Sequence, residues 1–143
     1  MKNRKNHPQK TRDAKPFEIW IAQLPARKGC CTKGGRRPVV VISAEAYATL
    51  SHVSVIPLTK DLTARQLPTH VLLCSRFLDR PSRALCEQVT TVEKPHLIRR
   101  IGYVEEPFDR FVLRRALALH LNLMPICEFG VPQEDTYSIL PLS

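Results

Sequence analysis

Three short patterns in the first third of the chain predict its first elements. Phe17, Ile19 and Ile21 occupy every second position, and a period of two predicts a β-strand over residues 17–24. Residues 39–42 are β-branched and apolar throughout, which is typical of a central strand buried on both faces. Ser43 is then expected to cap a short helix that extends to Leu50.

Later apolar runs predict three more strands, over residues 53–58, 70–73 and 84–92. Thr59 stands at the exit of the first of these runs, directly before a polar loop over residues 60–66. Residues 93–100 contain Pro95 and two arginines and lead into a short apolar stretch, so we do not count them as a strand.

A periodicity of three to four residues near the end of the chain predicts one amphipathic helix. Pro107 lies near its start, and two glutamates just before it favour the positive end of a helix. The apolar positions of this pattern are Phe108, Val112, Ala116, Leu119 and Leu123. Five strands followed by one helix predict a mainly β fold, a small antiparallel barrel with a C-terminal amphipathic helix.

Length and composition favour a single domain with two irregular ends. With 143 residues, 43% of them hydrophobic, the chain can bury one core, which we place at residues 17–123. Residues 1–16 are expected to form a basic tail and residues 124–143 an irregular one. The longest apolar run has four residues, against roughly 20 for a membrane span. No apolar stretch follows the basic start, so we expect a cytoplasmic protein.

The net charge of +9 is concentrated at the start of the chain. Residues 1–37 hold eleven Lys and Arg against Asp13 and Glu18, which leaves +9, whereas residues 38–143 hold eleven charges of each sign. The loop over residues 25–37 has five basic side chains and no acidic one. A polyanion such as nucleic acid is therefore expected to bind near this segment.

Five cysteines form an odd set without CxxC spacing, which favours reduced thiols over disulfides or a zinc site. Cys74 and Cys86 lie in apolar runs and are expected to be small core residues. We expect neither a metal nor another cofactor.

Five ordered segments carry a resemblance to one protein family. Gly35-Arg36-Arg37-Pro38-Val39 runs from the basic loop into the apolar strand, as in the MazF/PemK toxins. It is followed in the same order by Pro57-Leu58-Thr59, Leu67-Pro68-Thr69-His70-Val71, Leu85-Cys86-Glu87-Gln88-Val89 and Thr91-Val92-Glu93-Lys94, and then by a final helix. The chain thus resembles this family over residues 17–123.

The resemblance implies an SH3-like, MazF/CcdB-like barrel that forms a homodimer and binds single-stranded RNA and a cognate antitoxin protein. It implies the toxin of a type II toxin-antitoxin system, a metal-independent, sequence-specific endoribonuclease whose products carry 2′,3′-cyclic phosphate and 5′-hydroxyl ends. The catalytic positions carry over to Arg37 and Thr59. The expected RNA-binding residues are Arg27, Lys28, Cys31, Thr32, Lys33, Arg36, His70, Glu87, Gln88 and Thr90.

The chemistry of these residue types suits that reaction. Negative charge develops on the non-bridging phosphate oxygens, where a guanidinium offers a matching fork of donors and a threonine hydroxyl adds a hydrogen bond. The general base stays open, because arginine keeps its proton at ordinary pH. His52, His70 and Glu87 are candidates, although each also has a purely structural interpretation.

Two alternatives remain. Family members commonly carry Gly-Ser-Glu where this chain has Cys30-Cys31-Thr32, and an arginine where it has Thr90, so a degenerate homologue could bind RNA or antitoxin without cleaving. Gyrase-poison toxins share the barrel but resemble one another in a terminal Trp-Gly-Ile. This chain ends in Leu-Pro-Leu-Ser, which argues against that class.

Overall fold

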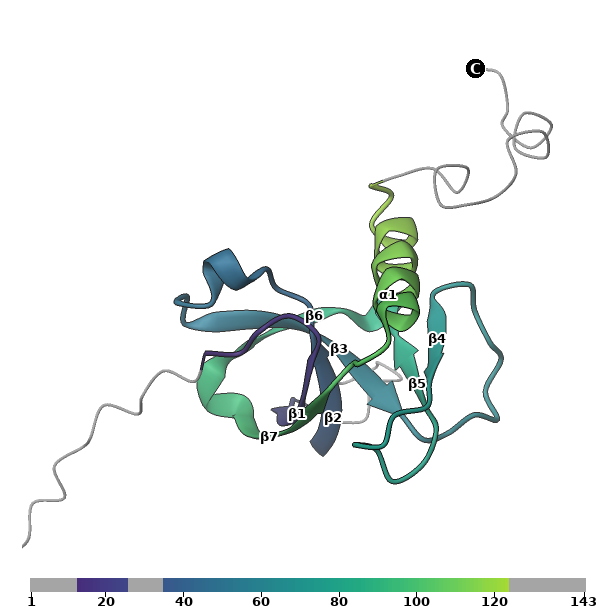
Figure 1. Ribbon diagram of the computed structural model, residues 1–143, viewed down its shortest axis with the longest axis horizontal. Helices are drawn as coiled ribbons and strands as arrows, with labels where there is room; N and C mark the ends of the chain where they lie inside the picture. The colour runs from purple at the N-terminus through teal and green to yellow at the C-terminus, as the bar shows by residue number, and fades with distance from the viewer. Residues whose placement is uncertain (1–12, 26–34, 124–143) are drawn as a thin grey trace, which may run out of the picture.

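The computed structural model describes residues 13–25 and 35–123, which form one curled antiparallel sheet and one helix (Figure 1). The predicted mainly β fold with a C-terminal amphipathic helix is confirmed. The elements are β1 (Glu18–Leu24), β2 (Gly35–Val41), η1 (Glu45–Tyr47), β3 (His52–Thr59), β4 (His70–Leu73), β5 (Ser82–Leu85), η2 (Cys86–Gln88), β6 (Thr90–Glu93), η3 (Lys94–His96), β7 (Leu97–Tyr103) and α1 (Pro107–His120).

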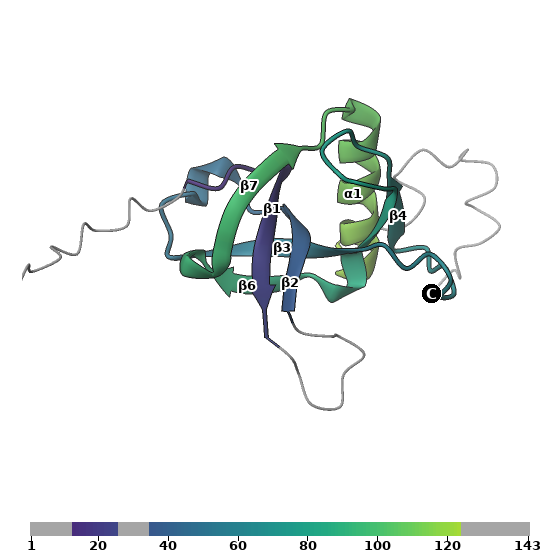
Figure 2. The same cartoon turned by 90° about the horizontal axis from the view of Figure 1, so that it is seen from below.

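Strand β3 organises the sheet because three other strands pair with different parts of it. Its first half pairs with β6, its middle with β2 and its last two residues with β5. The path through the sheet is β4-β5-β3-β2-β1-β7, with β6 on β3. Figure 2 shows β3 crossing β1 and β2 at a steep angle, so the sheet curls strongly. Its described path ends at β4 and β7 without closing into a ring, so the barrel is open.

The two faces of the curled sheet bury two hydrophobic clusters, because successive strand residues point to opposite sides. Ile19 and Val40 belong to the cluster that packs against α1 through Leu113. Trp20 and Val39 belong to the other cluster, inside the curl. The sequence of β2 is apolar at both sets of positions for this reason, as predicted for a central strand.

The described residues form seven strands where the sequence predicted five. The strand predicted over residues 84–92 is two strands, β5 and β6, separated by the turn η2. The chain needs this turn because β5 pairs with the end of β3 whereas β6 pairs with its beginning. Strand β7 was missed, since Arg99 and Arg100 interrupt its apolar pattern. It pairs with β1 through an irregular register.

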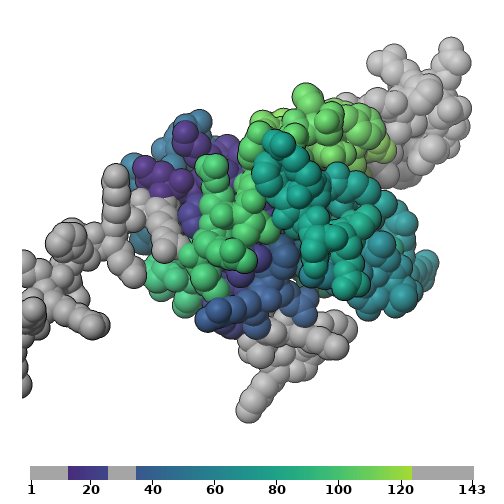
Figure 3. Space-filling view, turned by 60° about the horizontal axis from the view of Figure 1, so that its bottom comes forward, coloured from purple at the N-terminus to yellow at the C-terminus, as the bar shows by residue number. Residues whose placement is uncertain are grey.

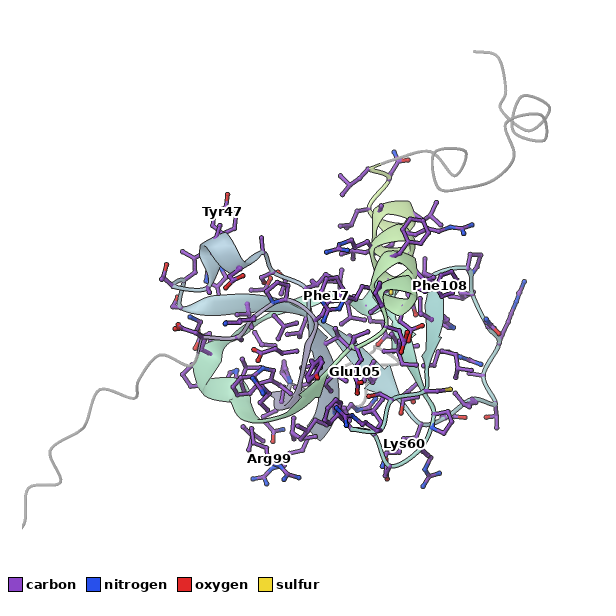
Figure 4. All side chains as sticks on the ribbon, in the orientation of Figure 1. Phe17, Tyr47, Lys60, Arg99, Glu105 and Phe108 are labelled. Carbon is purple, nitrogen blue, oxygen red and sulfur yellow. The ribbon has the colours of Figure 1, made fainter. Side chains whose placement is uncertain are left out.

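Helix α1 begins at Pro107, which was predicted to lie near its start, but its apolar stripe is shorter than expected. Leu113 and Ala116 are buried, whereas Phe108 is 72% and Leu123 is 69% exposed. Phe108 projects from the side of the helix in Figure 4. The pattern was wrong at its two ends: Phe108 lies in the first turn with its side chain in solvent, and Leu123 lies beyond the helix, which ends at His120.

Two further sequence predictions need correction. Ser43 does not cap a helix: its hydroxyl accepts a 2.5 Å hydrogen bond from the Ser54 N–H and so joins the chain after β2 to β3, and only the three-residue turn η1 follows. Cys74 is exposed rather than in the core. Cys86 is buried as expected, and desolvation, with a smaller effect of Glu87, raises the pKa of its thiol to about 12.

Most of the two predicted tails, residues 1–12 and 124–143, lies outside the described residues. Ala14, on the tail side of the predicted boundary at residue 17, is buried in the same cluster as Trp20. No helix in the described part of the chain is long and apolar enough to cross a membrane.

Candidate functional site

A groove of about 700 Å³ opens at the end of the sheet where β1 and β3 end and β2 and β7 begin. Figure 3 shows the green surface of β7 beside the teal residues around position 75, with the blue residues of β2 below them. Arg37 and Thr59 both line this groove. The other lining residues are Ile21, Arg36, Pro38, Leu58, Lys60, Asp61, Phe77, Leu78, Asp79, Ile98, Arg99 and Ile101.

Antiparallel pairing brings Arg37 to Thr59. Val39 of β2 is opposite Pro57 of β3, and extending this register by two residues places Arg37 opposite Thr59. Arg37 therefore lies within β2, opposite Ala22 of β1, and not at the end of a loop as the sequence predicted. Arg37 is half-buried, whereas Arg36 is exposed.

The hydroxyl of Thr59 is oriented by the backbone that follows it. Its Oγ1 accepts a 3.2 Å hydrogen bond from the Asp61 N–H, so the hydroxyl proton stays available for an anion. Asp61 in turn accepts hydrogen bonds from the N–H and the hydroxyl of Thr63, at 2.9 and 2.5 Å. The start of the loop after β3 is thus held by its own polar groups.

Arg83 of β5, which was not identified from the sequence, holds the same loop by hydrogen bonds to its backbone. Its side chain is nearly buried and donates to the carbonyl oxygens of Ala64 at 2.9 Å and Leu62 at 3.2 Å. Arg83 lies opposite Thr59 in the β3–β5 pairing, so one residue supports both the strand end and the loop. An arginine in a short strand gave no sequence signal for this role.

The groove is positively charged. Four cations line it, Arg36, Arg37, Lys60 and Arg99, against two carboxylates, Asp61 and Asp79, which leaves +2. Lys60 and Arg99 lie at the same edge of the molecule in Figure 4. Among the described residues, no ion pair joins any of the three arginines to a carboxylate. This arrangement suits an anionic ligand.

Lys60 differs from those arginines because it contacts Asp79 across the rim, with 2.5 Å between Nζ and Oδ2. The hydrogen bond from Lys60 and its charge hold the pKa of Asp79 below the ordinary 3.8. Neither residue was singled out from the sequence. The position of Lys60 directly after Thr59 was a usable signal, whereas Arg99 could not be found without recognising β7.

His70 and Glu87 lie in a separate polar cluster between β4 and η2. The Leu67 N–H donates to His70 Nδ1 at 3.1 Å, so the proton is on Nε2, which donates to Glu87 Oε1 at 2.8 Å. The Thr69 hydroxyl donates to the other Glu87 oxygen at 2.9 Å. His70 is almost buried, and both its ring nitrogens are engaged.

The remaining predicted residues divide into two groups. Gln88 in η2 and Thr90 at the start of β6 are half-buried, and like His70 they do not line the groove in the described part of the chain. His52 begins β3 and Thr59 ends it, roughly 23 Å away at 3.3 Å per residue. The other five predicted RNA-binding residues, Arg27, Lys28, Cys31, Thr32 and Lys33, lie in the segment that joins β1 to β2, outside the described residues.

No group of three or more His, Cys, Asp and Glu side chains that could hold a metal ion occurs within residues 13–25 and 35–123. The described groove therefore offers hydrogen-bond donors and positive charge as its chemistry.

Comparisons with known proteins agree with the resemblance found in the sequence. Residues 15–119 match the family described as PemK-like, MazF-like toxin of type II toxin-antitoxin system. The chain is 30% identical over 92 residues to Endoribonuclease MazF of Staphylococcus epidermidis, covering 62% of this chain and 76% of that protein.

Solved structures share the fold. Mycobacterium tuberculosis toxin MazF-mt6 is 29% identical with a TM-score of 0.62, covering 76% of this chain and 99% of that one. A mycobacterial endoribonuclease in complex with its cognate antitoxin is 22% identical with a TM-score of 0.61, covering 78% of this chain and 97% of that one, and it supports the fold alone. This chain thus belongs to the family of PemK-like, MazF-like toxins of type II toxin-antitoxin systems.

Proposed function

We propose that this toxin cleaves single-stranded RNA at specific sequences without a metal, and that Arg37 and Thr59 bind the scissile phosphate. Membership in the family, with a relative named Endoribonuclease MazF, makes the chain an endoribonuclease toxin. The cleavage chemistry, the sequence specificity and the residues involved are our proposal.

In the proposed reaction the 2′-oxygen of a ribose attacks the adjacent phosphorus and the bond from phosphorus to the 5′-oxygen breaks. The 2′-hydroxyl loses its proton and the leaving 5′-oxygen gains one, which gives 2′,3′-cyclic phosphate and 5′-hydroxyl ends. DNA lacks the nucleophile and is not cleaved in this way. Because the nucleophile belongs to the substrate, a metal-bound water is not required.

Arg37 and Thr59 stabilise the charge that develops on the non-bridging oxygens. The Arg37 guanidinium supplies a planar fork of donors, and the Thr59 hydroxyl supplies a proton that its contact with Asp61 leaves available. Donors placed in advance in this way stabilise a transition state more than donors that must reorganise. The observation that carries the proposal is that both residues line one cationic groove on neighbouring strands.

The proton acceptor is not assigned to a histidine. No described histidine lines the groove, since His52 lies at the far end of β3 and His70 has both ring nitrogens engaged. Arg37 and Thr59 therefore act as phosphate stabilisers in this proposal, and neither serves as the base.

The same surface suggests further binding partners. Arg36 borders the groove and would neutralise the RNA backbone together with Arg27, Lys28 and Lys33 of the preceding segment. We further propose that a cognate antitoxin covers this groove, that the toxin is a homodimer, and that it acts in the cytoplasm, where its RNA substrate occurs.

The test is a digest of single-stranded RNA by the purified toxin in excess chelator, followed by sequencing of the product ends. We expect cyclic phosphate and 5′-hydroxyl ends at a recurring sequence, and loss of cleavage in Arg37→Ala. Arg65→Ala is the matched control, because Arg65 is an exposed arginine of the loop after β3 that does not line the groove. Cleavage that requires a metal, or full activity of Arg37→Ala, would contradict the proposal. RNA binding without cleavage would favour the degenerate homologue.

A further inference from the structure

One ion pair spans the rim of the groove. Lys60 belongs to the loop between β3 and β4, and Asp79 belongs to the loop between β4 and β5. Lys60 Nζ and Asp79 Oδ2 are 2.5 Å apart, and the two side chains are 44% and 62% exposed. Both residues line the groove, so the pair joins two loops beside the proposed phosphate site.

The backbone positions of both residues are held independently of the pair. Lys60 lies between Thr59 and Asp61, whose side chain and backbone are hydrogen-bonded to each other at 3.2 Å. Before Asp79, Leu78 is buried and its N–H donates to the Ser75 carbonyl at 3.1 Å. The loops therefore stay in place when the ion pair opens, and only the two side chains need to move.

The pair is the kind that a polyanion can displace. Two exposed charges on a surface contribute little to folding, because water screens them and both side chains lose freedom. A single-stranded nucleic acid offers several phosphates at once and gains further by releasing its counterions. Lys60, next to Thr59, is thus a cation that is paired with a carboxylate of the protein itself. A polyanion that binds Lys60 more strongly can replace this carboxylate.

We propose that Lys60 is a further phosphate-binding residue of the groove and that Asp79 is its resident counter-ion, which RNA displaces on binding. This inference rests on the proposed function, because it names the backbone of single-stranded RNA as the ligand. Asp79 competes with the RNA for Lys60 and so sets the affinity of the groove below the value that its cations alone would give.

Binding of a 15-nucleotide RNA that is 2′-O-methylated throughout tests this inference, since such a probe has no free 2′-hydroxyl and cannot be cleaved. We expect Asp79→Asn to tighten binding about two- to five-fold at low salt, the range for an exposed pair. Lys60→Gln should weaken binding and reduce the slope of log affinity against log salt by about 0.7, the value for one phosphate contact of a single strand.

Glu105→Gln is the matched control for the loss of one negative charge. Glu105 forms an exposed ion pair of 2.7 Å with Arg76 and borders a smaller cavity of about 190 Å³. It should tighten binding less than Asp79→Asn does. In the double variant Lys60→Gln/Asp79→Asn, the gain from Asp79→Asn should fall to the level of this control.

The inference is overturned if Glu105→Gln and Asp79→Asn have equal effects, if Lys60→Gln leaves affinity and salt slope unchanged, or if the gain persists in the double variant. Cleavage of unmodified RNA is assayed separately. Wild-type toxin that binds the probe with the expected variant effects but leaves RNA intact would contradict the proposed chemistry and retain the role of Lys60. A toxin that does not bind the probe would contradict both.

Discussion

Two polar regions of this molecule differ in whether their polar side chains find hydrogen-bond partners within the protein. In the cluster of His70, Glu87 and Thr69, the imidazole nitrogens, the two carboxylate oxygens and the hydroxyl all have partners within the protein. In the groove, Arg37 has no carboxylate partner among the described residues, and the Thr59 hydroxyl proton has none either. The polar groups of the cluster bond to one another, whereas Arg37 and Thr59 keep donors without a partner in the described part of the chain.

This contrast separates stability from binding. A buried polar group without a partner lowers the stability of the folded state. We therefore interpret the closed cluster as contributing to stability. Donors that line an open groove stay hydrated and gain a charge-assisted partner when an anion arrives. The predicted RNA-binding roles of His70 and Glu87 and the predicted catalytic roles of Arg37 and Thr59 can therefore be tested against each other.

The largest effect is expected at Arg37. Arg37→Ala should lower the rate of RNA cleavage about a hundred- to a thousand-fold, the range for removing one donor to a developing oxyanion. Arg37→Lys should recover only part of this loss, because it keeps the charge but not the planar fork. Rates are measured at saturating RNA, and urea unfolding should give an unchanged midpoint for both variants. A large loss of stability in Arg37→Ala would instead indicate that Arg37 has a structural role, like the residues of the closed cluster.

Glu87→Ala should show the opposite pattern. It removes the acceptor of the His70 Nε2–H and of the Thr69 hydroxyl. Leaving such groups unpaired in a partly buried site should cost about 1–3 kcal/mol of unfolding free energy. Cleavage per folded molecule should be retained. A stable variant that binds RNA poorly would instead support the sequence-based assignment of Glu87 to RNA binding.

The two threonines give a matched comparison. Thr59→Val should reduce cleavage about ten-fold, because one hydrogen bond to a charged phosphate is lost, with little change in stability. Thr69→Val should lower the unfolding free energy by about 1 kcal/mol with little change in cleavage. The same two measurements are made on both variants. Equal profiles would remove the distinction between groove and cluster.

The smallest effect concerns the pH dependence of stability. Because Lys60 lowers the pKa of Asp79 in the folded protein, the pair contributes stability above about pH 4 and loses it as the pH falls below 3.8. Asp79→Asn should make the unfolding free energy slightly less dependent on pH below about pH 4. Urea titrations at several pH values would show this, and identical pH profiles would contradict the ion pair.

The sequence was informative where local pattern and packing agree. The apolar residues of β2 and the start of α1 at Pro107 follow directly from it, and so does the presence of Arg37 and Thr59 on one surface, through the family resemblance. Strand β7 was missed because its apolar pattern is broken by two arginines, one of which, Arg99, faces the groove. A charged residue that lines a groove breaks the apolar periodicity of the strand that carries it.

Long-range partners were also beyond the sequence. The contact of Arg83 with the carbonyls of Ala64 and Leu62 joins residues 19 and 21 positions apart, and no local pattern signals it. The same is true of Lys60 and Asp79, which are 19 positions apart. Only the return of β5 along the end of β3 brings these loops together.

The pairing of β1 with β7 has a consequence for the toxin during its own synthesis. Glu18 is opposite Tyr103, so the groove combines residues from β1 and β2 with Ile98, Arg99 and Ile101, which the ribosome adds some 60 or more positions after Arg37. Contacts so distant along the chain carry a large loop-closure entropy and slow folding. A nascent or truncated chain that ends before β7 lacks these three residues and therefore one wall of the groove, so the groove is complete only when translation of the domain is nearly finished.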